Sequence, residues 1–214
     1  MKEVLPQPAD PDSLIISYLT LRKVVGLLGV SLVPVMVLGS FLFDRTTYIQ
    51  ISVSAYYYTD MRNPMIGILC GIAMFLLSYH GYKWYDSLAS KLAGVFALCI
   101  AFFPTSDTSS KEDIISKLHY LTAGLFFAIL AGMSIFLFTK SSGNMTAEKK
   151  KRNRIYRICG IVMAVSVAGI PVGGIPAIHE RIKFIKPTLI LETLALASFG
   201  FSWLTKGEFL LKDK

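Results

Sequence analysis

The sequence predicts an all-α membrane protein, a single bundle of about six transmembrane helices with both termini in the cytoplasm. The composition favours this class, because the 214-residue chain is 53% hydrophobic and 17% charged, whereas soluble domains have about 25% charged residues. The pattern favours it too, because apolar runs of about 16–21 residues alternate with charged patches, as is typical of transmembrane helices. No interval between the runs is long enough to form a separate domain.

Six spans are expected in order along the chain. They cover residues 24–43, 64–79, 87–103, 118–139, 155–177 and 186–205. The second and third are short and need their flanking aromatic residues to complete a crossing, so four or five crossings remain an alternative. The expected organisation is a cytoplasmic segment, residues 1–23, with a short interfacial helix that Ser13 caps, a transmembrane domain, residues 24–205, and a cytoplasmic tail, residues 206–214.

The distribution of basic residues predicts the orientation, because cytoplasmic loops are richer in Lys and Arg. Fifteen lie in the N-terminal segment, the second and fourth connections and the C-terminal tail, and seven lie in the other three connections. This excess places both termini inside and the first, third and fifth connections outside. Basic residues beside a span also meet anionic headgroups. Membrane lipid is therefore an expected partner for this chain of net charge +8, and nucleic acid is not.

Local signals shape several of these spans. Pro34 lies inside the first span, where a proline kinks the helix. The second span contains Gly67-x-x-x-Gly71, a spacing that lets two helices approach closely. The fifth span ends in GIPVGGIP, residues 169–176, which breaks the helix near the outer surface. That stretch is either a re-entrant segment lining a cavity or a loose exit from the membrane.

Several kinds of catalytic or metal site lack their sequence signals. The three cysteines fall inside expected spans without CxxC spacing, which favours packing residues over a disulfide or zinc site. His80 is expected at the inner end and His119 and His179 at the outer end, so the three cannot meet across about 30 Å of hydrocarbon. No GxSxG elbow surrounds Ser52 or Ser54, and no phosphate loop or dinucleotide fingerprint is present. We therefore expect no metal and no cofactor.

Unusual polar residues gather at the outward ends of spans two, three, four and six. One cluster is residues 52–63, a second is residues 104–107 with His119, and a third is residues 179–186 with Glu192. Glu192 is the most informative, because an ionisable group inside a span is costly and faces a polar interior or a partner. The candidate ligand-binding residues are Tyr57, Asp60, Arg62, Asp107, His119 and Glu192.

Each candidate has a functional and a structural interpretation. Glu192 is suited to proton exchange, pairing with a cationic ligand or general-base work, or to a structural pair with Arg62 or Lys186. His119 is an acid, a base, a metal ligand or a polar anchor, and no motif supports a mixed metal site with a carboxylate. Arg62 either recognises a carboxylate or phosphate, or pairs locally with Asp60.

The order of several segments resembles a family of small bacterial integral membrane proteins of unknown function. The segments that carry it are SVSAYYYTDMRN, HGYKWYD, AGVFALCIAFFPTSD, HYLTAGLFF and RNRIYRICG. The likeness extends over residues 21–207. It implies a compact multi-span fold in the bacterial cytoplasmic membrane and assigns no functional residues.

Three functions fit these observations. The first is a polytopic protein whose outward-facing polar pocket binds or moves a lipid headgroup or small solute. The second is a membrane-embedded enzyme, a lipid hydrolase or transferase, in which His119 and a carboxylate act as acid and base. The third is a structural or regulatory membrane subunit. The sequence leaves open whether the protein is an enzyme, which residues would be catalytic and what its oligomeric state is.

Overall fold

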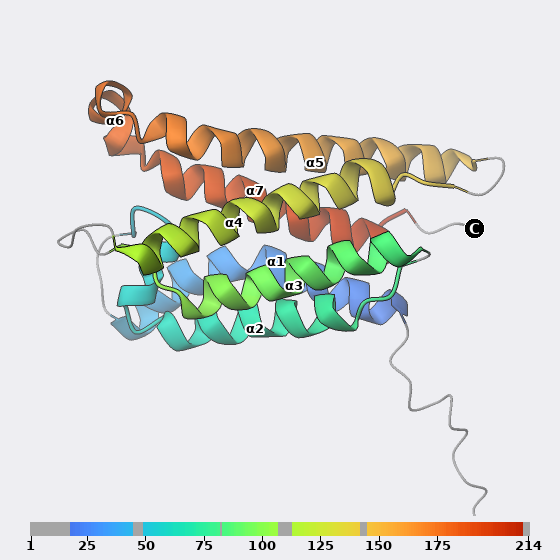
Figure 1. Cartoon of the computed structure of the whole chain (residues 1–214), viewed down its shortest axis with the longest axis horizontal. Coiled ribbons are helices and arrows are strands. Elements are labelled where there is room, and N and C mark those ends of the chain that lie inside the picture. The colour runs from blue at the N-terminus through green and yellow to red at the C-terminus, as the bar shows by residue number, and fades with distance from the viewer. Residues whose placement is uncertain (1–17, 45–48, 82, 107–112, 142–144, 212–214) are drawn as a thin grey trace, which may run out of the picture.

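The computed structural model describes residues 18–44, 49–81, 83–106, 113–141 and 145–211, and every regular element in those ranges is helical. Six long helices lie side by side along one axis (Figure 1). They are α1 (Tyr18–Gly39), α2 (Arg62–Ser78), α3 (Trp84–Phe102), α4 (Ile114–Gly132), α5 (Ala147–Gly173) and α7 (Pro187–Lys206). The short elements are η2 (Ser40–Asp44), η3 (Ser54–Tyr58), η4 (Met133–Leu137), α6 (Pro176–Ile182) and η5 (Lys183–Ile185).

Five of these helices are long and apolar enough to cross a membrane. They are α1 continued by η2, α3, α4 continued by η4, α5 and α7. The remaining long helix, α2, is apolar but has 17 residues, about 26 Å of rise, against roughly 30 Å of hydrocarbon. The predicted all-α membrane class is confirmed. That α2 is a sixth crossing stays a prediction.

Successive long helices run in alternating directions, so α1 begins and α7 ends at the same end of the bundle (Figure 1). There, a Cβ atom on Gly207 would lie 3.0 Å from the backbone nitrogen of Lys23. At the other end, the backbone N–H of Leu189 donates to the carbonyl of Ile51 over 3.2 Å. We call the first the terminal end and the second the opposite end.

Helix α7 lies between α1 and α5, and its contact with α1 includes Gly26, Gly29 and Gly200. A Cβ atom on Gly200 would lie 2.6 Å from the carbonyl oxygen of Gly26, so the two backbones leave no room for a side chain. By contrast, nothing lies within 4 Å of a Cβ atom on Gly67, and Gly71 meets only Leu28. Only the second glycine of the Gly67-x-x-x-Gly71 spacing therefore lies at a helix contact, where α2 meets α1.

Aromatic rings fill the core beside that glycine contact. Trp203 of α7 meets Phe138 and Phe199 edge to face, with ring centroids 5.4 and 6.3 Å apart. Tyr156 of α5 meets Phe138 at 5.6 Å. All four rings are at most 2% exposed, and such pairs add about 0.5–1.5 kcal/mol each beyond their buried area.

Two helices begin earlier than the apolar pattern predicts. Tyr18 to Lys23, expected in a separate interfacial helix, belong to α1, and Ser13 lies outside the described residues. Helix α5 begins at Ala147 because the hydroxyl of Thr146 accepts a hydrogen bond from the N–H of Lys149 at 3.1 Å, and the basic residues that follow favour helix. The GIPVGGIP segment continues α5 through Pro171 and then starts α6 at Pro176.

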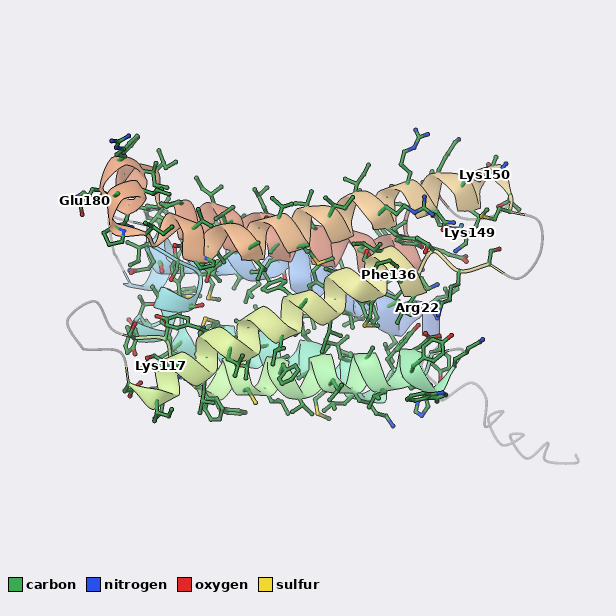
Figure 2. All side chains as sticks on the ribbon, turned by 45° about the horizontal axis from the view of Figure 1, so that its top comes forward. Arg22, Lys117, Phe136, Lys149, Lys150 and Glu180 are labelled. Carbon is green, nitrogen blue, oxygen red and sulfur yellow. The ribbon has the colours of Figure 1, made fainter. Side chains whose placement is uncertain are left out.

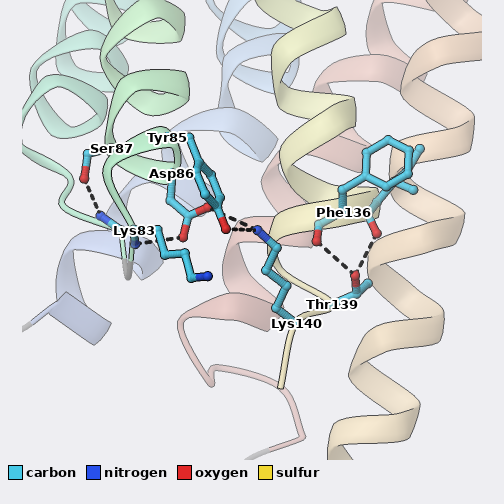
Figure 3. Close-up of polar contacts among 9 residues, drawn as sticks. Lys83, Tyr85, Asp86, Ser87, Phe136, Thr139 and Lys140 are labelled. Atoms are coloured by element: carbon cyan, nitrogen blue, oxygen red, sulfur yellow. Dashed lines mark hydrogen bonds and ion pairs between the residues drawn. The ribbon is translucent and has the colours of Figure 1, made fainter. Parts of the chain in front are cut away.

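Polar contacts at the terminal end join the start of α3 to the α4–α5 connection (Figure 3). The carboxylate of Asp86 accepts from the N–H of Lys83 at 3.2 Å, which closes the first turn of α3. Lys140 donates to the hydroxyl of Tyr85 at 2.9 Å and lies 3.7 Å from Asp86. The hydrogen bond to Tyr85, followed by the Asp86 charge, raises the pKa of Lys140. These charged contacts lie near the surface of the terminal end.

Candidate functional site

Glu192 lies near the start of α7 and holds the start of η3. Its Oε2 atom accepts a hydrogen bond from the backbone N–H of Val53 at 2.5 Å, and its Oε1 atom lies 3.2 Å from the hydroxyl of Ser54. The first N–H groups of a helix have no partner within it, so a carboxyl from a distant helix satisfies them here. Neither cation proposed as its partner, Arg62 or Lys186, pairs with it in the described part of the chain.

His119 lies in the second turn of α4 and is 3% exposed. Its Nδ1 atom is 2.7 Å from the carbonyl oxygen of Phe103, and its Nε2 atom is 3.1 Å from the hydroxyl of Ser54. The start of α4 fixes this position, because Asp113 caps the helix by accepting from the N–H of Ser116 at 2.8 Å. That hydrogen bond, more than any other contact, lowers the pKa of Asp113.

Ser54 thus links the two candidates in a continuous His119–Ser54–Glu192 chain. A carbonyl oxygen only accepts, so the Nδ1 atom of His119 carries a proton. If the ring is neutral, Nε2 accepts from Ser54, whose single proton is then used, and Glu192 must be protonated to donate to Ser54. If the ring is doubly protonated, Nε2 donates to Ser54, and Ser54 donates to an ionised Glu192.

The two arrangements have the same atoms and the same net charge of zero. They differ only in whether the extra proton is on the carboxyl or on the imidazole. The contacts therefore permit a proton to be held at either Glu192 or His119, with the Ser54 hydroxyl between them. This is a relay geometry, and in an apolar bundle it avoids leaving an uncompensated charge.

The chain forms one wall of a partly open cavity of about 60 Å³. The other walls are apolar and come from α1, α2, α3, α4 and α7, including Leu32, Leu69, Ile100, Phe126, Phe127 and Leu196. A cavity of this size holds a few water molecules or one small chemical group. It is smaller than the roughly 300–1,000 Å³ of a site for a whole drug-sized ligand.

The other sequence candidates lie elsewhere. The guanidinium of Arg62 donates to the hydroxyl of Tyr57 at 2.6 Å and lies 4.3 Å from the centre of its ring. Arg62 and Asp60 are exposed, and neither they nor Tyr57 line the cavity. Asp107 lies outside the described residues. The structure therefore joins two of the six candidates, His119 and Glu192, and places Arg62 and Tyr57 in a separate surface pair.

Sequence reasoning did not single out Ser54 or the N–H of Val53. Serine is common in connections, and nothing in SVSAYYY distinguishes Ser54 from Ser52, whose hydroxyl accepts from the N–H of Ala55 at 3.0 Å. The role of Ser54 depends on the 3-10 turn of η3, which points its side chain between α4 and α7. Its position inside the polar cluster at residues 52–63 was the one available signal.

A metal does not suit this arrangement. Over the ranges that the structure describes, no three His, Cys, Asp or Glu side chains gather closely enough to hold an ion. His80 follows α2 at the terminal end, while His119 is at the opposite end. The single imidazole and single carboxyl at the cavity are already bonded to each other through Ser54.

Comparisons with protein-family models, with curated proteins and with solved structures give no match. The class of the protein therefore rests on its own fold and site. It is a helical membrane protein in which a carboxyl, a hydroxyl and an imidazole from three elements meet at the wall of an apolar cavity.

Proposed function

We propose that the protein binds or moves a small solute or a lipid headgroup at this cavity, which opens toward the outside of the bacterial cytoplasmic membrane. One observation carries the proposal. His119 and Glu192, on helices far apart in the sequence, are joined through Ser54 at the wall of a cavity that is otherwise apolar. Polar groups inside a membrane bundle are costly, and they commonly mark the path or site of a ligand.

The proposed topology has six crossings with both termini in the cytoplasm. The alternating helix directions support an even number of crossings (Figure 1). The basic cluster at residues 149–157 supports a cytoplasmic terminal end. In this topology the cavity is at the outward side. Helix α2 spans a slightly thinned bilayer, and thinning the bilayer to match a short helix has a modest free-energy cost.

The number of protons at the site defines which ligands suit it. A ligand with one negative charge is offset when Glu192 and His119 are both protonated, which takes one further proton, and a ligand with one positive charge is offset when Glu192 is ionised beside a neutral His119, which releases one. The apolar walls accept the hydrocarbon part of such a ligand. Because the cavity holds only one small group, we propose a small solute or one charged group of a headgroup, with the rest of the molecule outside.

Accessibility of Ser54 tests the site and the orientation together. Ser54→Cys is made in a chain in which Cys70, Cys99 and Cys159 are replaced by alanine. We expect a small membrane-impermeant thiol reagent added to intact cells to modify it. Ser52→Cys, two residues away and not at the cavity, is the matched control for exposure of the connection. Modification only after the membrane is opened would contradict the outward orientation.

Ligand protection tests the binding itself. In detergent, short-chain phosphatidylethanolamine, short-chain phosphatidylglycerol, acetate and methylammonium are compared as probes that slow thiol labelling of the Ser54→Cys variant. We expect at least one to slow it severalfold without slowing the labelling of the Ser52→Cys control. If none of the four protects the thiol introduced at position 54 while the variant stays folded, the cavity is not a site for these groups.

One specific observation favours an enzyme as the second candidate. The hydroxyl of Ser54 is 3.1 Å from the Nε2 atom of His119, and the carbonyl of Phe103 orients the ring, as in a nucleophile and its base. The order differs from a Ser–His–acid triad, because Glu192 contacts Ser54 and not the Nδ1 atom. Labelling by a fluorophosphonate that Ser54→Ala and His119→Ala both abolish would favour this function over simple binding.

A further inference from the structure

The basic segment at the start of α5 presents two faces with different surroundings. Two of its cations turn into the bundle. Lys149 donates to the carbonyl of Phe138 at 2.9 Å, and Arg152 donates to the carbonyl of Leu211 at 2.6 Å. Arg152 is 6% exposed. Both side chains satisfy backbone carbonyls, and Arg152 holds Leu211 against α5.

Three other cations of the segment lie on the outer face. Lys150, Arg154 and Arg157 are all exposed, and within the described ranges none has a hydrogen-bond or ion partner. They are spaced four and three residues apart, so they share one face of the helix. Figure 2 shows Lys149 and Lys150 together at the terminal end. Three like charges on one face repel each other, which favours a bound anion.

These three cations line a groove of about 350 Å³, which we call the α5 groove. Its remaining lining includes Met145, Ile158 and Ile161 and contains no acidic side chain. Glu148, the acidic residue of the first turn of α5, is not part of it. The groove is therefore positively charged at one end, without a carboxylate that would neutralise it.

An apolar stripe continues the same face away from the cations. Ile158 and Ile161 are each 55% exposed, and Val165, one turn further, is 65% exposed. They follow Arg154 and Arg157 at helical spacing, so the stripe runs from the charged groove toward the middle of the bundle along α5. A molecule that fits both parts has an anionic head and a hydrocarbon tail.

We infer that the α5 groove binds one anionic phospholipid from the leaflet at the terminal end. Its phosphate contacts Arg154, Arg157 and Lys150, and an acyl chain lies along Ile158 and Ile161. Arginine suits this role because its planar guanidinium donates two parallel hydrogen bonds to phosphate. Basic pockets beside membrane helices bind anionic headgroups in this way. The site is at the other end of the bundle from the His119–Ser54–Glu192 chain and does not depend on the function proposed for that chain.

Native mass spectrometry of the whole protein in a mild detergent tests the inference. The probes are phosphatidylglycerol and phosphatidylcholine with the same acyl chains. We expect the double variant Arg154→Gln/Arg157→Gln to bind phosphatidylglycerol roughly 30-fold more weakly, since each cation near the membrane contributes about a factor of five. Binding of phosphatidylcholine, which is weaker from the start, should change little.

The matched control removes the same charge outside the groove. Lys91→Gln/Lys151→Gln replaces two exposed lysines that do not line it, and we expect phosphatidylglycerol to bind as before. Arg154→Lys/Arg157→Lys keeps the charge without the paired hydrogen bonds, and we expect an intermediate loss. All four substituted arginine and lysine positions are exposed, so far-ultraviolet circular dichroism should stay unchanged.

Three outcomes would overturn the inference. One is unchanged binding of phosphatidylglycerol by Arg154→Gln/Arg157→Gln. Another is an equal loss in the Lys91→Gln/Lys151→Gln control, which would show that only the overall charge matters. The third is competition by glycerol phosphate as effective as that of the phospholipid itself, which would make the site one for a free phosphate and leave Ile158 and Ile161 without a role.

Discussion

The two halves of α7 make opposite kinds of contact. In residues 195–205, eight side chains or glycines are buried, and Gly200 is in backbone contact with Gly26 of α1. In residues 187–194 no residue is fully buried, and Glu192 is bonded to a connection and to the polar chain beside a cavity. One helix therefore combines a tightly packed anchor with a more open polar segment.

This difference separates stability from function within a single element. Close-packed cores respond to small changes of volume, whereas ligand sites come from the less tightly packed parts of a protein. The aromatic and glycine contacts hold α7 in place at the terminal half. The opposite half can then retain a cavity and an ionisable side chain without endangering the fold. The following substitutions test this division.

The largest effect is expected at the glycine contact. Gly200→Val places atoms where the carbonyl of Gly26 lies, so we expect a loss of about 3 kcal/mol in the free energy of unfolding, the upper part of the range for overpacking. Denaturant unfolding in detergent measures it. Gly67→Ala is the matched control, since nothing lies within 4 Å of the added atom, and it should stabilise α2 by up to about 1 kcal/mol. Equal effects at the two glycines would remove the distinction between the halves.

Glu192 tests the opposite half. Glu192→Ala leaves the N–H of Val53 without its acceptor, and we expect a loss of about 2 kcal/mol in the same unfolding assay. Glu192→Gln retains an oxygen for Val53 and an NH₂ group for Ser54, as a protonated carboxyl would. If the extra proton is normally on Glu192, Glu192→Gln should unfold like the wild type. A loss as large as that of Glu192→Ala would place the proton on His119.

The link through Ser54 should show as coupling. Ser54→Ala alone should cost about 1 kcal/mol, the net worth of a typical hydrogen bond. When Ser54→Ala is combined with His119→Gln, the two losses of unfolding free energy should not add, because both substitutions remove the same contact. The expected coupling energy is about 0.5–1 kcal/mol. Thermal unfolding of the two single variants and the double variant measures it. Additive losses would mean that the 3.1 Å contact contributes nothing.

The smallest effect is expected from the cap of α4, and it depends on pH. The pKa of Asp113 is lowered chiefly by the N–H of Ser116, so its contribution is present above the ordinary value of 3.8 and is lost as the pH falls through the folded value. Asp113→Asn should keep the cap and lose this pH dependence, whereas Asp113→Ala should lower the unfolding temperature at neutral pH as well. Melting curves of the wild type and the two variants at neutral and strongly acidic pH measure this effect. Identical curves for the three proteins would contradict the expectation.

The fold class could be predicted from the sequence because the bilayer restricts which structures can span it. Apolar runs of spanning length leave helices as the solution, and His119 and Glu192 were placed at one end because the number of crossings between them is countable. Their joining was not predictable, since it passes through the hydroxyl of Ser54 and the backbone N–H of Val53. A backbone donor has no signature in the sequence.

The glycines show the same limit on what can be predicted from the sequence. The spaced pair Gly67 and Gly71 suggested a helix contact, but only Gly71 meets a neighbour, Leu28 of α1, whereas Gly26 and Gly200 meet each other although 174 positions separate them in the sequence. Which glycine is used depends on which helices become neighbours. That is a property of the whole bundle and not of any one span.

The hydrogen bond between Glu192 and Val53 also has a consequence for the order of synthesis. The two residues are 139 positions apart, and Glu192 is on α7, which is synthesised after the other five long helices that the structure describes. Until that helix is inserted, the first connection lacks the acceptor that fixes the start of η3. A nascent chain without α7 should therefore expose this connection to proteases, and insertion of α7 would protect a segment made much earlier.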